Sequence, residues 1–303
     1  MFLGKLLIIF FKKYPYAPRK TLLRCSEIRP VINHNKKTIM FEQIILGIIQ
    51  GITEWLPVSS EGFIILAKTN LFHSAGTIEE AIRQALFLHF GTFLAALIYF
   101  RRDVKELIET ISSYKSQPKE TQKLFSFLLI ATMISGAVGF PLIKTLSSIA
   151  TQMESQGKII TLMIGCLLLG TAFLELKAKK NGYRGLCDLK ISDGILLGIV
   201  QGLAALPGLS RSGLTVSTLL LRKLDKTYAL KLSFLMSLPA VLAGNLMLNF
   251  NTLAWSVETL AGLTFSFIFG FASIHLLLKI AEKVNFGYFV LLFGVLTILS
   301  AIF

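Results

Sequence analysis

Long apolar runs separated by short polar segments make up most of the chain. Each run is close to the roughly 20 residues that a helix needs to cross a hydrocarbon core. The runs lack the alternation of polar and apolar positions typical of a membrane β-barrel, so helices are favoured. Six predicted spans share these properties: residues 82–100, 124–143, 158–176, 228–249, 259–279 and 285–303. The pattern therefore predicts an all-α, polytopic membrane protein.

One stretch of the pattern occurs twice. Residues 46–62 read LGIIQGITEWLPVSSEG, and residues 197–213 read LGIVQGLAALPGLSRSG. Each copy places glycine, proline, hydroxyl and charged residues inside apolar sequence, which is costly in lipid unless the backbone lines a cavity. We therefore predict two re-entrant helical hairpins, each opening one half of the chain, at about residues 40–180 and 190–303.

The connecting segments predict the orientation of these halves. Residues 101–123, 177–190 and 222–231 are rich in lysine and arginine, which is typical of cytoplasmic loops. The linkers near Glu79 and at residues 249–258 are poor in basic residues and are expected on the opposite side. Each half then crosses the membrane an odd number of times. The halves are therefore predicted to be inverted repeats whose hairpins meet near the midplane.

The first 39 residues differ from the rest. They hold nine basic residues and one acid, Glu27, and so carry +8 of the net charge of +14. The predicted topology places them outside, against the usual distribution of positive charge. We interpret residues 1–39 as a basic extension that is disordered, rests on anionic lipid, or precedes a translation start at Met40. Residues 40–303 are predicted to form a single membrane domain.

Composition excludes several classes of protein. The chain is 53% hydrophobic and 16% charged, which is too apolar for a soluble domain. The positive charge is explained by membrane orientation, so no nucleic-acid partner is expected. The three cysteines, Cys25, Cys166 and Cys187, have no spacing that favours a zinc site or a disulfide framework.

The first hairpin contains an anion-binding pattern. Gln50 and Glu54 are four residues apart and share one face of a helix. Pro57 breaks that helix, and the following hydroxyls lie at a predicted helix start, where backbone N–H groups can hold a phosphate. His89, on an apolar span, is the one histidine that we keep as a cavity-lining or proton-handling candidate.

The second hairpin contributes a fixed cation, Arg211, flanked by hydroxyls. A guanidinium group binds phosphate oxygens with two parallel hydrogen bonds. The structural alternative is that glycine and proline only bend helices, that the serines bond back to carbonyls, and that Glu54 and Arg211 form a purely structural ion pair.

The segments Gln50-Gly-Ile-Thr-Glu54-Trp-Leu-Pro-Val-Ser-Ser60 and Pro207-Gly-Leu-Ser-Arg211-Ser-Gly-Leu-Thr215 resemble the two signatures of the bacitracin-resistance type undecaprenyl-diphosphate phosphatases. The resemblance implies a multi-pass cell-membrane hydrolase that removes the terminal phosphate of a polyprenyl diphosphate. This reaction recycles the lipid carrier for cell-wall peptidoglycan synthesis. It also implies dependence on a divalent cation, Mg²⁺ or Ca²⁺, and a site open to the outer face. A homodimer is a further expectation.

The resemblance also implies roles for individual residues. Glu54 would position the metal or activate a nucleophile, Ser60 would be the nucleophile or a phosphate ligand, and Arg211 would stabilise the transferred phosphoryl group. Further residues are expected to bind substrate: Gln50, Ser59, Glu61, Ser210, Ser212 and Thr215.

One position departs from the family pattern. The family usually has a histidine where this chain has Phe63. Glu61, two residues earlier, could take over proton transfer. The alternative is a polyprenyl-phosphate or anion translocase that keeps the phosphate-binding arginine but does not hydrolyse its substrate.

Overall fold

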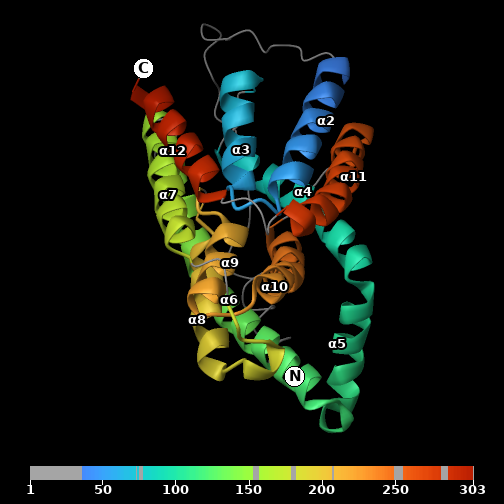
Figure 1. Ribbon diagram of the computed structural model, residues 1–303. Helices are drawn as coiled ribbons and strands as arrows, with labels where there is room; N and C mark the ends of the chain where they lie inside the picture. Colours follow the sequence, from blue (N-terminus) through green and yellow to red (C-terminus); the bar gives the residue numbers. More distant parts are fainter. Residues whose placement is uncertain are drawn as a thin grey trace, which may run out of the picture. The chain divides into compact units, whose positions relative to one another are not determined.

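The computed structural model describes residues 36–302 except residues 73, 75–77, 153–156, 179–181, 207, 249–254 and 281–285. These residues form helices and connecting turns without any extended strand (Figure 1). The helices are α2 (Lys36–Thr53), α3 (Ser60–Leu66), α4 (Ile78–Tyr99), α5 (Arg101–Ser113), α6 (Lys119–Gln152), α7 (Gly157–Lys177), α8 (Ile191–Leu203), α9 (Arg211–Leu221), α10 (Lys226–Leu248), α11 (Val257–Ile280) and α12 (Phe286–Ile302). The predicted all-α fold class is confirmed.

The predicted spans correspond to α4, α6, α7, α10, α11 and α12. Four of these helices contain described stretches long and apolar enough to cross a membrane: Glu80–Tyr99, Lys119–Thr145, Lys226–Met247 and Val257–Leu277. Large apolar side chains on them, such as Leu129 and Met133, are exposed. Apolar residues that face outward along a span are expected where lipid is the solvent. The chain is a multi-pass membrane protein.

The two predicted hairpins are present, and each uses the same device to restart its helix. Helices α2 and α3 form the first hairpin, and α8 and α9 form the second (Figure 1). Ser59 caps α3 by accepting a hydrogen bond from the N–H of Gly62 at 3.2 Å. Ser210 caps α9 by accepting one from the N–H of Gly213 at 3.1 Å. The sequence repeat is therefore also a structural repeat.

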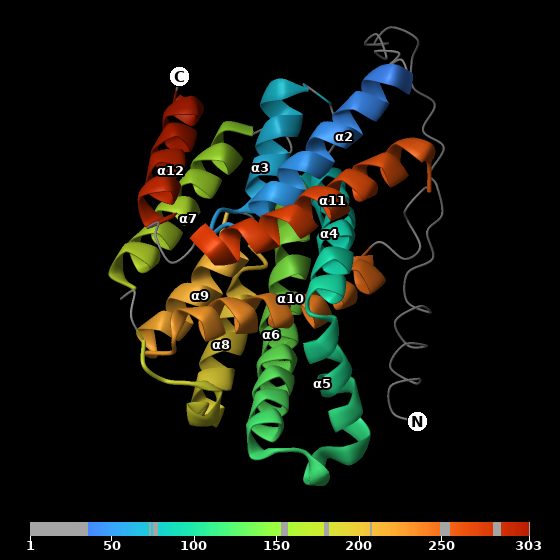
Figure 2. The ribbon, with the colours of Figure 1, turned by 45° about the vertical axis from the view of Figure 1, so that its right-hand side comes forward.

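The helices of each half of the membrane domain pack on helices of the other half. Helix α2 of the first hairpin packs on α11, and α8 of the second hairpin packs on α6 (Figure 2). Helix α4 packs on α10, and α7 packs on α12. Each hairpin thus packs on a long helix of the opposite half. This exchange is expected of inverted repeats.

Small residues allow the hairpins to approach the long helices. In α2, a Cβ on Gly51 would lie 2.7 Å from the backbone nitrogen of Gly270 on α11. At the equivalent place in α8, a Cβ on Gly202 would lie 2.6 Å from the Cβ of Val138 on α6. Glycine four residues apart, as at Gly47 and Gly51, is the usual arrangement for close helix pairs in membranes.

The three basic connecting segments lie at one end of the membrane domain. Lys231 Nζ lies 2.5 Å from Asp103 Oδ1. Arg184 donates a hydrogen bond to the carbonyl of Arg222 at 2.8 Å, and Lys123 donates to the carbonyl of Cys187. Segments 101–123, 177–190 and 222–231 therefore touch one another, as their shared predicted side requires.

Charged pairs close the base of each hairpin. In the second hairpin, the buried carboxylate of Asp193 on α8 is 2.6 Å from Nε of Arg222, directly after α9. In the first hairpin, Glu42 on α2 is 3.8 Å from Nζ of Lys68, just after α3. Glu42 and Asp193 occupy equivalent positions in the repeat, four residues before Leu46 and Leu197. The two ends of each hairpin are therefore held together by charge.

Two boundaries differ from the sequence prediction. Helix α2 spans Lys36–Thr53 and so includes residues 36–39, which were predicted as part of the basic extension; lysine is a good helix former, and these residues add an exposed first turn. Residues 101–113, predicted as part of a loop, form the amphipathic helix α5, whose period was hidden among its many charges. Residues 1–35, His73, Pro207 and most of the linker at residues 249–258 lie outside the described residues.

Candidate active site

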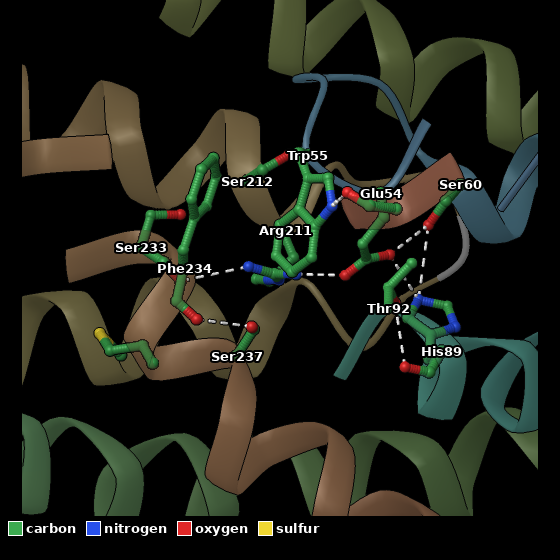
Figure 3. A network of polar contacts seen from close by, with 12 residues as sticks. Glu54, Trp55, Ser60, His89, Thr92, Arg211, Ser212, Ser233, Phe234 and Ser237 are labelled. Atoms are coloured by element: carbon green, nitrogen blue, oxygen red, sulfur yellow. Dashed lines mark hydrogen bonds and ion pairs between the residues drawn. The ribbon is translucent and has the colours of Figure 1, made fainter. Parts of the chain in front are cut away.

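The two hairpin loops meet at a small cleft. Helix α4 supplies one further side chain, so three separate segments contribute to the lining (Figure 3). The lining residues are Glu54, Val58, Ser59, Ser60, Glu61, His89, Ala204, Leu209, Arg211 and Ser212. The predicted meeting of the two hairpins is therefore present, and it brings Glu54, Ser60 and Arg211 into one cleft.

Glu54 is fixed at the end of α2. Its backbone N–H donates to the carbonyl of Gln50 at 3.0 Å, which continues the helical pattern by one residue. The Gln50 side chain donates from Nε2 to Glu54 Oε2 at 2.8 Å. Both residues are buried, with exposed fractions of 0% and 5%. Their spacing of four thus places them on one face, as predicted, and orients the carboxylate.

Arg211 opens α9 and is held on three sides. Its guanidinium forms an ion pair with Glu54 Oε1 and donates to the carbonyl of Ser233 on α10 at 3.2 Å (Figure 3). It also lies over the ring of Trp55, 5.8 Å from the ring centroid. Trp55 is itself anchored by a hydrogen bond from Nε1 to the carbonyl of Gly270 at 3.1 Å. The cation is therefore pre-positioned at the cleft.

Ser60 presents its hydroxyl at the start of α3. Its Oγ donates to Glu54 Oε2 at 3.0 Å and lies 3.4 Å from Nε2 of His89. A hydroxyl between a carboxylate and an imidazole is the arrangement of an activated nucleophile.

Two other cleft hydroxyls join the hairpins. Ser59 Oγ accepts a hydrogen bond from the N–H of Gly208 at 3.1 Å. In return, Ser212 Oγ donates to the carbonyl of Leu56 at 2.6 Å. Each loop thus satisfies a backbone group of the other, which buried loops in a membrane require. Ser59 and Ser212 line the cleft, and they also set the distance between the hairpins.

Three expected substrate-binding residues do not line the cleft: Gln50, Ser210 and Thr215. Ser210 caps α9, and Thr215 Oγ1 donates to the carbonyl of Arg211 at 2.7 Å. Thr215 Oγ1 is also 2.7 Å from Ser233 Oγ, and Gln50 holds Glu54. In the structure these side chains support Glu54 and Arg211. Direct contact between them and a phosphate stays a prediction.

His89 is the residue whose place the sequence did not reveal. From α4, its Nε2 lies 3.0 Å from Glu54 Oε2, opposite to Arg211 (Figure 3). Its Nδ1 lies 2.6 Å from the carbonyl oxygen of Ala85. The sequence marked His89 as a cavity-lining candidate. It did not show that the face of α4 that carries His89 meets the first hairpin, because that depends on how the helices cross.

Phe63, at the position of the family histidine, is used for packing. Its ring lies against Phe293 of α12, with centroids 4.9 Å apart, and it is not a lining residue of the cleft.

The donors available to a cation are few. Within the described residues, no group of three or more histidine, cysteine, aspartate or glutamate side chains is placed to hold a metal. Both oxygens of Glu54 already have protein partners. The remaining carboxylate that lines the cleft is that of Glu61. Oxygen donors of this kind suit Mg²⁺ or Ca²⁺ when substrate phosphates complete the coordination.

Comparisons with known proteins identify the family of this chain. The family model described as bacitracin resistance protein BacA matches residues 43–299. The chain is 42% identical over 266 residues to the undecaprenyl-diphosphatase of Methanococcoides burtonii. The aligned region covers 86% of this chain and 97% of that protein. It is 36% identical over 267 residues to the undecaprenyl-diphosphatase of Haloarcula marismortui, covering 86% and 96%. The match spans both hairpins and all six long helices, and the chain belongs to the bacitracin resistance protein BacA family.

Proposed function

We propose that this chain hydrolyses undecaprenyl diphosphate, or a related polyprenyl diphosphate, to the monophosphate and inorganic phosphate. The observation that carries the proposal is the single cleft in which Ser60, Glu54 and Arg211 are in contact within a membrane helix bundle. Relatives named undecaprenyl-diphosphatase match almost their whole length, which supports the same assignment. A site between membrane-embedded loops suits a substrate whose tail lies in the bilayer.

Each of the three residues has a distinct role. Arg211 binds oxygens of the terminal phosphate and stabilises the charge that develops during transfer. Ser60 Oγ attacks the terminal phosphorus, the bond to the bridging oxygen breaks, and the polyprenyl monophosphate leaves. Water then releases the phosphate from Ser60. Glu54 orients Arg211 and Ser60, because one of its oxygens contacts the guanidinium and the other accepts a hydrogen bond from the serine hydroxyl.

We propose that a divalent cation assists by neutralising the diphosphate. Glu61 would hold it together with substrate oxygens, while the ion pair with Arg211 keeps Glu54 in the supporting role. Bound there, the cation would supply charge stabilisation. Exchange of Glu61 for glutamine should raise the Mg²⁺ concentration for half-maximal activity by about tenfold, the usual order of a lost carboxylate partner. The matched exchange of Glu109 on α5, which pairs with Lys105 outside the site, should leave it unchanged.

The cell membrane is the proposed location, where hydrolysis would return the lipid carrier to envelope glycan synthesis. The translocase alternative rested on the missing histidine at position 63. An imidazole does lie beside Ser60, supplied by His89, so that ground for the alternative is gone.

Phosphate release from undecaprenyl diphosphate by the purified protein in detergent, with Mg²⁺ or Ca²⁺, tests the proposal. Arg211→Ala should lower kcat/KM by about 10³-fold, near the upper range for loss of a charge-stabilising donor. Ser60→Ala should abolish release. Release that is undiminished in both variants, or absent in the native protein with either cation, would overturn the assignment.

A further inference from the structure

We propose that His89 is a catalytic residue of this site and carries the proton of Ser60, the task left open by phenylalanine at position 63. The inference rests on the proposed phosphatase function and deepens it. Phe63 lies three residues after Ser60 on α3, but its ring packs on Phe293. The imidazole reaches the nucleophile from a different helix.

The position of His89 next to the reacting groups carries this proposal. Nε2 lies 3.4 Å from Ser60 Oγ and 3.0 Å from Glu54 Oε2 (Figure 3). Ser60 Oγ is itself 3.0 Å from the same oxygen of Glu54. The hydroxyl, the carboxylate and the imidazole thus form a closed triangle. A proton that leaves Ser60 has direct hydrogen-bonded access to the ring.

The second ring nitrogen determines which nitrogen does the chemistry. Nδ1 lies 2.6 Å from the carbonyl oxygen of Ala85, one turn earlier on α4. A carbonyl oxygen only accepts hydrogen bonds, so Nδ1 carries a proton and donates it there. Nε2 is therefore the nitrogen that exchanges protons with Ser60 and Glu54. The orientation of a catalytic imidazole is commonly fixed in this way.

The neighbouring helix holds His89 in place. Ser266 on α11 donates to the carbonyl of Leu88 at 2.7 Å, and a Cβ on Gly91 would lie 2.6 Å from the carbonyl oxygen of Leu263. His89 is 8% exposed and lines the cleft. The close contact between α4 and α11 thus fixes the face of α4 that carries the ring.

Glu61 is the competing candidate for proton transfer. It lines the cleft on the turn that carries Ser60. Among the described contacts, however, the Ser60 hydroxyl is bonded to Glu54 and faces His89, and its neighbours do not include Glu61. Geometry therefore favours the histidine.

The proton movements balance in both halves of the reaction. When Ser60 Oγ bonds to the terminal phosphorus, its proton passes to the Glu54–His89 pair. The polyprenyl monophosphate leaves on the far side of the phosphorus, in line with Ser60, with the electrons of the broken bond, and the pair passes the proton on to solvent. In the second half, water bonds to the phosphorus and gives a proton to the pair, and His89 returns a proton to Ser60 Oγ as the serine–phosphate bond breaks.

Exchange of His89 for glutamine is the sharpest test. Glutamine can still donate a hydrogen bond to Glu54, but it cannot carry a proton. The expected result is a fall in kcat of about 10²–10⁴-fold with KM changed by less than about threefold. The matched exchange His275→Gln, on α11 where the ring contacts Tyr99, should leave kcat within about twofold of the native value.

A second variant, His89→Ala, leaves space for added imidazole. Imidazole in the assay should raise its kcat at least tenfold while leaving His89→Gln unchanged, a response that a merely structural residue would not give. Native kcat in His89→Gln would overturn the inference, and so would the absence of imidazole rescue in folded His89→Ala. Neither result touches the proposed function, which fails only if the native protein releases no phosphate.

Discussion

Glu54 and Arg211 are 157 positions apart in the chain, and their side chains form an ion pair where the two hairpins meet. Both are largely screened from solvent, with side-chain exposures of 3% and 16%. A buried charge that loses its partner is strongly destabilising, whereas removal of both charges is far better tolerated. The pair therefore links the stability of the fold to the chemistry of the cleft.

This link predicts strong coupling in a double-mutant cycle. Glu54→Gln and Arg211→Ala should each lower the free energy of unfolding. The double variant should lose less than the sum of the two by about 1–3 kcal/mol, because no unpaired charge remains. Denaturation in detergent, followed by circular dichroism, measures this coupling. Simple additivity would contradict an energetically significant pair.

The two serine caps give a second prediction. Ser59 caps α3 and also accepts from Gly208 of the other hairpin, whereas Ser210 only caps its own helix and contacts Ser212. Ser210→Ala should cost about 1 kcal/mol, as for a lost cap. Ser59→Ala should cost about 1–3 kcal/mol more, because the N–H of Gly208 is left unsatisfied. Thermal unfolding of both variants tests the difference, and equal losses would argue against the cross-hairpin bond.

The turn of the second hairpin depends on Gly208. Its φ of 99° lies in the left-handed region, and a Cβ there would be 2.9 Å from Cα of Ile164. Gly208→Ala should therefore lower stability by about 1–3 kcal/mol from backbone strain alone and should reduce activity by displacing Arg211.

Gly170 provides the control for that exchange. It lies within α7, and a Cβ there would meet nothing within 4 Å. Gly170→Ala should therefore preserve both the melting temperature and phosphate release. Loss of function of similar size in the two variants would show that general sensitivity to substitution, and not the turn, is responsible.

Exchange of Phe63 for histidine tests whether the cleft lacks an imidazole. With His89 already beside Ser60, we expect kcat of Phe63→His to stay within about threefold of the native value, as is usual for a substitution outside the reacting groups. Loss of the ring contact with Phe293 should lower the melting temperature slightly. A gain of tenfold or more in phosphate release would mean that His89 does not fill the missing role.

Much of the fold was predictable because the bilayer constrains sequence locally. The length of an apolar run sets each span, and glycine or proline beside charged residues marks a chain break at membrane depth. Even the pairing of Gln50 with Glu54 follows from helical periodicity. Helix α5 was missed because its amphipathic pattern lies among charges typical of a loop.

The site was only partly predictable. The sequence identified Glu54, Ser60 and Arg211 as the groups with suitable chemistry, and it placed them on two hairpins that had to meet. It did not separate the hydroxyls that face the cleft from those, such as Ser210 and Thr215, that hold the backbone of α9. Both kinds have the same residue type and similar spacing, so only contacts distinguish them.

The sequence by itself determined the membrane class, the repeated hairpins and the identity of the anion-binding groups, because each follows from interactions within a few residues or with the bilayer. Only the tertiary structure decided that Ser59 joins the hairpins and that His89 faces Ser60. Those relationships depend on how α4, the two hairpins and α11 cross one another. The crossings are set by side-chain packing between segments far apart in the chain, and local patterns in a single sequence do not show which distant segments pack together.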